Sequence, residues 1–266
     1  MKYFIEPLKV SHDNYKYCNS FSYTDYNYLQ ANIPSKIKRR HFELALTLTS
    51  KYFHAANVID IGCADGPFIP SLSNYFNNVV GIDISQEFVE QAKILVNKQS
   101  LENVSLICSK DKNIYTIKKE LGEKKYSIIF LLEIMEHVGN HWETMYEDKL
   151  AFLKEISKLI DDEGFIVISV PKMVGISFFF QIFGQIIFNL GHKQEMLHLS
   201  YKDILKCILF YDTDNIEHLW VSSTHMGFNH KKLERFIKPD FEIIKSKSDW
   251  FQQLYVIKSV ASILKD

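Results

Sequence analysis

Two glutamates and a histidine lie close together near the middle of the chain, in the run Glu133-Ile-Met-Glu136-His137. Spacings of three and four residues place these side chains on one face of a helical turn. Two carboxylates and an imidazole on one face can bind a divalent cation, and Mg²⁺ or Mn²⁺ is favoured over zinc because no thiolate is nearby. A fourth ligand must come from elsewhere, and His225 is the best candidate because it comes just before the helical pattern from Lys231 to Ile237.

The same residues can also act without a metal. His137 can serve as a metal-free general base. A third interpretation gives these side chains a structural role only. We therefore treat His137 and Glu133 as candidate catalytic residues, and Glu133, Glu136, His137 and His225 as candidate metal ligands.

A second group of residues is suited to holding a nucleoside cofactor. The apolar run from Val58 to Ile61 leads into a turn of small residues, Gly62, Ala64 and Gly66, which lets the backbone bend sharply and approach a ligand. A dinucleotide site requires Gly-x-Gly-x-x-Gly facing a pyrophosphate, whereas this Gly-x-Ala-x-Gly spacing suits a cofactor without a diphosphate. Asp83 ends a second apolar run, at the position where a carboxylate can bind ribose hydroxyls.

Alternating strand and helix patterns must position these residues. The expected strands are Val58 to Ile61, Val79 to Asp83, Val104 to Ser109, Tyr126 to Glu133 and Gly164 to Pro171, and the expected helices are Phe68 to Phe76, Gln86 to Lys98 and Glu147 to Ile160. This alternation predicts a parallel sheet with crossover helices. Two further strands, Phe241 to Ser248 and Leu254 to Ser262, are joined too closely for a crossover, so we expect them to form an antiparallel pair.

One segment interrupts the alternation, because Met173 to Leu190 contains no charged residue and is nearly long enough to span a bilayer. A polar residue recurs every four positions in it, at Ser177, Gln181, Gln185 and Asn189, and this polar stripe argues against a simple span. The segment is either a lid helix packed on the domain, or an interfacial helix or wall for an apolar substrate. We expect one domain over residues 1–266, with an N-terminal flap at 1–40 and an inserted cap at 173–225.

The composition indicates an ordinary globular protein. With 266 residues, of which 47% are hydrophobic, the chain can bury a large core. The net charge of −1 provides no general attraction to nucleic acid or to acidic lipid. The four cysteines are far apart and fit a reducing compartment, and the first residues lack the apolar core of a signal peptide, so we expect cytoplasmic residence.

Four motifs, in the right order, resemble the successive motifs of class I S-adenosylmethionine-dependent methyltransferases. They are Asp60-Ile-Gly62-Cys-Ala64-Asp-Gly66, Gly81-Ile-Asp83, the run from Ile129 to Val138, and Glu163-Gly164 to Pro171. The resemblance implies a doubly wound, Rossmann-like α/β fold. Its seven-stranded sheet would end in an antiparallel C-terminal strand, with a helical cap inserted. It also implies an enzyme that transfers a methyl group from S-adenosylmethionine.

The resemblance further implies which residues bind this cofactor. Gly62, Ala64 and Gly66 would lie under its methionine part, Asp83 would bind both ribose hydroxyls, and Asp60, Ile84 and Leu132 would complete the site. Ser109, Lys110 and Asp111 compete for the adenine, and we favour Asp111. Two positions depart from the family pattern. Ala64 stands where the middle glycine is usual, which is tolerable if its φ is negative, and Ser127 stands where an aspartate commonly opens the fourth strand.

A narrower resemblance concerns the acceptor side. The Glu-x-x-Glu-His turn, together with Thr224-His225, is similar to ubiquinone-pathway O-methyltransferases and to the 2′-O-methyltransferases that modify small-RNA 3′ ends. Both groups are associated with a divalent metal. The resemblance therefore implies that Glu133, Glu136, His137 and His225 hold Mg²⁺ or Mn²⁺, which polarises a substrate hydroxyl.

These observations lead to one expected function with two alternatives. We expect O-methylation of a small-molecule or lipid-like acceptor, with weak membrane-surface contact through residues 173–190 left open. The alternatives are a non-catalytic S-adenosylmethionine-binding protein and an RNA 2′-O-methyltransferase. The near-neutral charge gives little support to a nucleic-acid partner.

Overall fold

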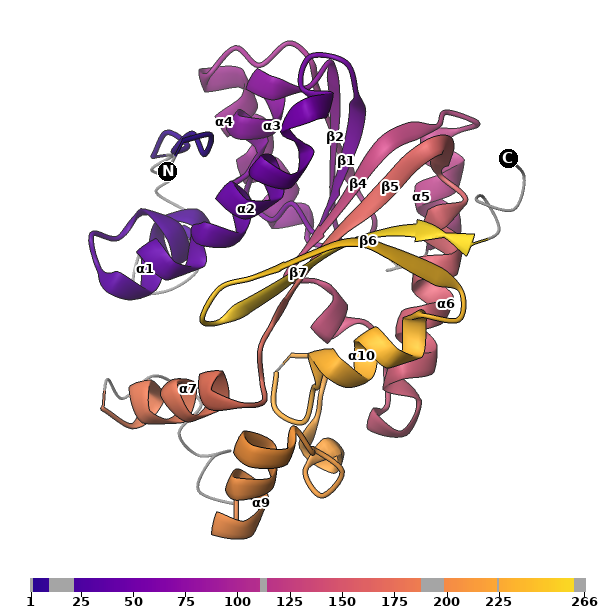
Figure 1. Cartoon of the computed structure of the whole chain (residues 1–266). Helices are drawn as coiled ribbons and strands as arrows, with labels where there is room; N and C mark the ends of the chain where they lie inside the picture. The colour runs from indigo at the N-terminus through magenta and orange to yellow at the C-terminus, as the bar shows by residue number, and fades with distance from the viewer. Residues whose placement is uncertain (1, 10–21, 111–113, 188–198, 224, 261–266) are drawn as a thin grey trace. The chain divides into compact units, whose positions relative to one another are not determined.

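The computed structural model in Figure 1 describes residues 2–9, 22–110, 114–187, 199–223 and 225–260, without the side chains of 114–116 and 184–187. The chain divides into two compact units. Unit 1 consists of Met1–Leu132 and Glu155–Ile168, and unit 2 consists of Glu133–Lys154 and Ser169–Asp266. The organisation as one domain with a flap and a cap stays a prediction.

Seven strands form a mixed sheet, in the order β3-β2-β1-β4-β5-β7-β6. Their bounds are β1 Asn57–Ile61, β2 Asn78–Asp83, β3 Val104–Cys108, β4 Tyr126–Leu132, β5 Ile160–Pro171, β6 Phe241–Ser248 and β7 Gln252–Ser259. β1 pairs in parallel with β2 and β4, β2 pairs in parallel with β3, and β6 and β7 are antiparallel. The expected Rossmann-like sheet with an antiparallel C-terminal strand is therefore confirmed.

Helices of unit 1 cover the parallel strands. Their bounds are α1 Ile33–Lys38, α2 Arg40–Thr49, α3 Ile69–Tyr75, α4 Gln86–Lys98 and α5 Ile114–Leu121. Both α3 and α4 contact β2, and Figure 1 shows them beside this strand. The sequence explains α4 directly, because the Ser85 hydroxyl accepts the Phe88 N–H at its start, and Val89, Ala92 and Leu95 form its buried face.

Unit 2 carries α7 Ile176–Ile187, α9 Tyr201–Leu205, α10 His230–Ile237 and most of α6 Met145–Ser157. Short helical turns occur over Asp25–Leu29, Ser50–Tyr52, Met135–His137, Trp142–Thr144, Lys206–Phe210 and Glu217–Leu219. Asn229 begins α10 because its side-chain oxygen accepts the N–H groups of Lys231 and Lys232. This cap fixes where the late helix follows the segment that contains His225.

Several expected boundaries differ from those of the structure by a few residues. β4 ends at Leu132 because Glu133 has a left-handed φ of 57°, which no strand residue adopts. The expected helix up to Ile160 ends at Ser157, and β5 starts at Ile160 instead of at the expected Gly164. At the start of β5, the Asp161 carboxylate accepts a hydrogen bond of 3.0 Å from the hydroxyl of Ser127 on β4. The serine that stands in place of the usual aspartate therefore still links two neighbouring strands.

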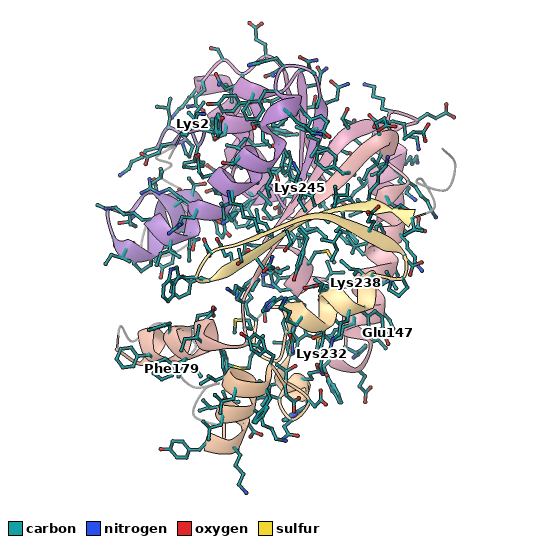
Figure 2. The ribbon with its side chains drawn as sticks, in the orientation of Figure 1. Lys2, Glu147, Phe179, Lys232, Lys238 and Lys245 are labelled. Atoms are coloured by element: carbon teal, nitrogen blue, oxygen red, sulfur yellow. The ribbon has the colours of Figure 1, made fainter. Side chains whose placement is uncertain are left out.

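α7 packs with its polar stripe inward. The Ser177 hydroxyl donates to the Trp250 carbonyl, and the Gln181 amide donates to the Lys172 carbonyl at 3.1 Å. The apolar side chains Phe179 and Phe183 are instead 43% and 52% exposed, and Phe179 is labelled in Figure 2. The expected stripe at Gln185 and Asn189 lies outside the described side chains. No helix in the described ranges is both long enough and apolar enough to cross a membrane.

Candidate functional site

The small-residue turn after β1 needs a left-handed backbone at every second position. The φ angles are 79° at Gly62, 48° at Ala64 and 94° at Gly66. Glycine adopts such φ angles freely, whereas alanine adopts them at a cost of roughly 1–2 kcal/mol because of its Cβ atom. The negative φ that would make alanine readily tolerable at position 64 is therefore not what the structure has, and the alternating small residues reflect the backbone path of this turn.

Asp83 fastens this turn to the end of β2. Its Oδ2 accepts the Ala64 N–H at 2.9 Å, and its Oδ1 accepts the Ser85 N–H at 2.8 Å. Each carboxylate oxygen has two lone pairs, so both oxygens can still accept a further hydrogen bond, such as one from a ribose hydroxyl. Burial raises the pKa of Asp83, and the bonds from Ser85 and Ala64 oppose that shift.

Two more acids are buried at the same turn. Burial, and secondarily the charge of Asp83, raises the pKa of Asp60 to about 7. Asp65 is 5% exposed, its pKa is raised by burial, and both of its oxygens accept from Thr24, one from the N–H at 3.0 Å and one from the hydroxyl. The turn is thus rich in acidic groups, which suits a cofactor that carries a sulfonium and an ammonium.

The remaining predicted cofactor residues differ in how exposed they are and in whether the structure describes them. Ile84 is 49% exposed after β2, Leu132 is 8% exposed at the end of β4, and Asp111 lies outside the described residues. The contact between Thr24 and Asp65 was missed, since their sequence separation of 41 residues leaves no local pattern. The sequence signal for this contact was the acid Asp65 inside the small-residue turn.

A second candidate site lies wholly in unit 2 and brings together Glu136, His137 and His225. Glu136 Oε1 is 3.8 Å from Nε2 of each histidine, and the two Nε2 atoms are 3.3 Å apart. A point equidistant from these three atoms lies about 2.1 Å from each, as the circumradius of that triangle gives. This is the bond length of common divalent cations to nitrogen and oxygen ligands.

Hydrogen bonds fix the chemistry of this cluster. Glu136 is fully buried, and neither of its carboxylate oxygens has a hydrogen-bond partner among the described residues. Burial raises the pKa of Glu136 well above its usual range, and the charge of Glu133 adds to the shift. His137 Nδ1 lies 2.8 Å from the Ser222 carbonyl oxygen, which can only accept, so neutral His137 carries its proton on Nδ1 and directs a lone pair from Nε2 into the cluster.

Glu133 does not join the three side chains that the structure brings together. Its carboxylate accepts a hydrogen bond from the Ser169 hydroxyl at 2.8 Å, and that hydroxyl also receives the Glu133 N–H at 3.1 Å. The left-handed backbone φ of 57° at Glu133 is unusual for a residue other than glycine, and such backbone strain is concentrated at functional sites. The roles of Glu133 as a catalytic residue and as a metal ligand stay predictions.

Two side chains that the sequence did not point to support the same turn. Lys149 is fully buried on α6, and its ammonium donates to the Val138 carbonyl at 2.6 Å. Burial lowers the pKa of Lys149 to about 7, although the carboxylates of Glu136 and Asp148 oppose that shift. Trp220 donates its indole N–H to the Glu136 carbonyl at 2.9 Å, and the Lys149 ammonium lies 4.4 Å from the centre of its ring.

Comparison with known proteins identifies the family. The family model described as a methyltransferase domain matches residues 29–229, so the chain belongs to this family. A ubiquinone biosynthesis O-methyltransferase from Pelagibacter ubique (strain HTCC1062) is 27% identical over 170 residues, which are 64% of this chain and 62% of that protein. The same-named protein of Coxiella burnetii (strain Dugway 5J108-111) is 27% identical over 46% of this chain and 47% of its own length. The matches thus span less than two thirds of these relatives.

Solved structures share the fold. The PH0226 protein from Pyrococcus horikoshii OT3 has a TM-score of 0.57 and 14% identity, with 88% of this chain and 96% of that one covered. N-methyltransferase NodS from Bradyrhizobium japonicum WM9, in complex with S-adenosyl-L-homocysteine, has a TM-score of 0.53 and 12% identity over 86% and 94%. The family match confirms the expected class, a methyltransferase, and the solved structures confirm its fold. S-adenosylmethionine stays the predicted cofactor.

Proposed function

We propose that the enzyme methylates a hydroxyl oxygen, and that the cluster of Glu136, His137 and His225 receives this hydroxyl. The observation that carries the proposal is the His137 Nε2 lone pair, which the Ser222 carbonyl fixes by holding the proton on Nδ1. A hydroxyl bound there can give its proton to Nε2. The curated relatives named as ubiquinone biosynthesis O-methyltransferases support oxygen as the acceptor atom.

The reaction needs alignment more than activation. The acceptor oxygen attacks the methyl carbon, the bond from this carbon to sulfur breaks, and the sulfonium becomes the neutral thioether of S-adenosylhomocysteine. The hydroxyl proton passes to His137. Because the sulfonium is already an activated donor, holding the oxygen in line with the carbon–sulfur bond supplies much of the rate enhancement. Burial lowers the pKa of His137, which keeps its Nε2 free to accept a proton at neutral pH.

The donor set of the cluster also fits a divalent cation. Glu136 has two buried oxygens without a described partner, and its Oε1 and the two histidine Nε2 atoms suit bonds of about 2.1 Å. We propose that Glu136, His137 and His225 hold Mn²⁺ or Mg²⁺, with Mn²⁺ favoured because two of the three ligands are imidazoles. Such an ion would occupy the His137 Nε2 lone pair, so it would take the place of proton transfer to His137 and would instead lower the pKa of an acceptor hydroxyl.

The acceptor is proposed to be a small molecule with an apolar or lipid-like part. Support comes from α7, whose polar stripe faces the protein while Phe179, Phe180 and Phe183 are 43%, 40% and 52% exposed. The Trp250 ring packs edge-on against Phe180 and is 62% exposed. Aromatic side chains of this kind suit an apolar acceptor or weak contact with a membrane surface. Cytoplasmic residence, with no nucleic-acid partner, stays part of the proposal.

Methyl transfer to defined acceptors tests this function. The enzyme is incubated with S-[methyl-³H]adenosylmethionine and 4-dodecylcatechol, 4-methylcatechol or 4-dodecylaniline, with and without Mn²⁺. We expect label on the catechols, more rapidly on the dodecyl compound, and a loss of about 100-fold in His137→Gln, because general-base catalysis contributes about that factor. Label on the aniline nitrogen alone, or full activity in His137→Gln, contradicts the proposal.

A further inference from the structure

Lys149 is difficult to explain by packing alone. Its side chain is fully buried between Trp220 and Phe228, and a buried ammonium is costly unless it is paired and hydrogen-bonded. An apolar side chain would fill the same space without that cost. The contacts of the ammonium therefore indicate why a lysine stands there.

These contacts involve the residues immediately before and after His137 in the chain. The Lys149 ammonium donates to the carbonyl of Val138, and the Trp220 indole donates to the carbonyl of Glu136. The two carbonyls belong to the residues on either side of His137, so the peptide group that precedes His137 and the one that follows Val138 are both held. The two donors also contact one another, because the ammonium lies 4.4 Å from the centre of the Trp220 ring.

The same segment also orients the imidazole. Ser222 follows Trp220 by two residues, and its carbonyl oxygen is 2.8 Å from His137 Nδ1. His225 lies three residues further along, with its Nε2 3.3 Å from His137 Nε2. Fixing Trp220 therefore fixes the carbonyl that selects which ring nitrogen of His137 carries the proton.

We propose that Lys149 and Trp220 form a clamp, in which Lys149 is a positioning residue that holds His137 in the orientation and tautomer with Nε2 unprotonated. This clamp acts through His137 and touches neither cofactor nor acceptor. The inference deepens the proposed function and rests on it for its catalytic consequence, but its structural content can be measured without any acceptor.

The direct test is ¹⁵N NMR of histidine-labelled protein at pH 8, with His137 assigned by its absence in His137→Gln. In the wild type we expect Nδ1 protonated and Nε2 unprotonated. Lys149→Met keeps the length and the apolar stem of the side chain but removes both the donor and the charge. It should give mixed tautomers at His137, whereas Lys149→Arg should keep the wild-type signal.

A matched control is Lys154→Met on the same helix, because Lys154 pairs with Asp240 and its side chain is 47% exposed. This variant should leave the His137 signals unchanged. Binding of S-adenosylhomocysteine should agree within about twofold in all variants, since the predicted cofactor residues are in unit 1. Turnover of 4-methylcatechol should fall 10- to 100-fold in kcat for Lys149→Met, with the KM for the catechol within about twofold.

The outcomes separate this inference from the proposed function. An unchanged His137 tautomer in Lys149→Met overturns the clamp, whatever the activity. A changed tautomer supports the clamp even if no catechol is methylated, in which case only the proposed function fails. Where Lys149→Met does not fold, Trp220→Phe replaces it, because this variant keeps an aromatic ring but removes the N–H that donates to the Glu136 carbonyl. It should also give mixed tautomers, and a wild-type signal overturns the clamp.

Discussion

Replacing Asp60 by asparagine should stabilise the enzyme without its cofactor at alkaline pH. Asp60 is 4% exposed, and burial beside Asp83 raises its pKa from 3.8 to about 7. Because the native state holds the Asp60 proton more tightly than the unfolded chain, stability falls as the pH rises from about 4 to about 7 and then stays level. A shift of about three pKa units corresponds to roughly 4 kcal/mol above pH 7. Asparagine cannot ionise and avoids this loss.

Urea unfolding at pH 5 and pH 8 measures the effect. At pH 8, Asp60→Asn should be more stable than the wild type by up to about 4 kcal/mol. At pH 5 the advantage should shrink by about 3 kcal/mol, because the native Asp60 carboxyl of the wild type is then protonated. Asp162→Asn, at an exposed position of β5 in the same unit, is the matched control variant. A difference between Asp60→Asn and wild type that is the same at both pH values refutes the reasoning.

The same variant should bind the cofactor less tightly. If the carboxylate of Asp60 faces a positive group of the cofactor, its loss should weaken binding by about 10- to 100-fold, since a hydrogen bond to a charged group contributes roughly 1.5–3 kcal/mol. Calorimetry at pH 8 with S-adenosylmethionine and with S-adenosylhomocysteine measures this change. The sulfonium form should lose more affinity than the neutral thioether. Unchanged affinity for both would remove Asp60 from the predicted cofactor site.

Three further substitutions test the strained turns and their supports. Ala64→Gly should stabilise the protein by about 1 kcal/mol in urea unfolding, because glycine adopts the left-handed φ without strain. The strain relieved exceeds the entropic cost of a more flexible unfolded chain, and a destabilised variant contradicts this. Thr24→Val should destabilise the protein by about 1–3 kcal/mol, since it leaves the buried Asp65 carboxylate with one donor fewer; stopped-flow should also show faster release of S-adenosylhomocysteine. Ser169→Ala should lower kcat with 4-methylcatechol by about 10-fold through a less ordered Glu133, whereas unchanged kcat shows that this bond does not serve catalysis.

The sequence predicted well what depends on local pattern. Helix α4 has the expected bounds because a capping serine and three apolar residues on one face determine it locally. The grouping of Glu136, His137 and His225 was also predicted, two of them by spacing and the third from the motif before α10. The cofactor turn was predicted from alternating small residues, although the φ of Ala64 was not.

What the sequence could not predict depends on contacts between distant residues. Glu133 forms a hydrogen bond with Ser169, a partner 36 residues away on β5, and no local pattern reveals this contact. The clamp joins Lys149 on α6 to Trp220, and nothing in the local pattern of either residue marks it as buried beside the other. Such pairs follow from the tertiary path of the chain, which overrides local preference.

One of the points where the chain passes from one unit to the other is the peptide bond that joins Leu132 to Glu133. Each described residue predicted for the methyl donor precedes this bond, and each one predicted for catalysis or metal binding follows it in unit 2. On these predicted roles, mutations in unit 2 would alter the acceptor side and leave the residues predicted for the methyl donor unchanged. In evolutionary terms, one lineage could acquire new acceptors by drift in residues 133–154 and 169–266, and a chimaera that exchanges these segments between relatives should inherit its acceptor preference from their source.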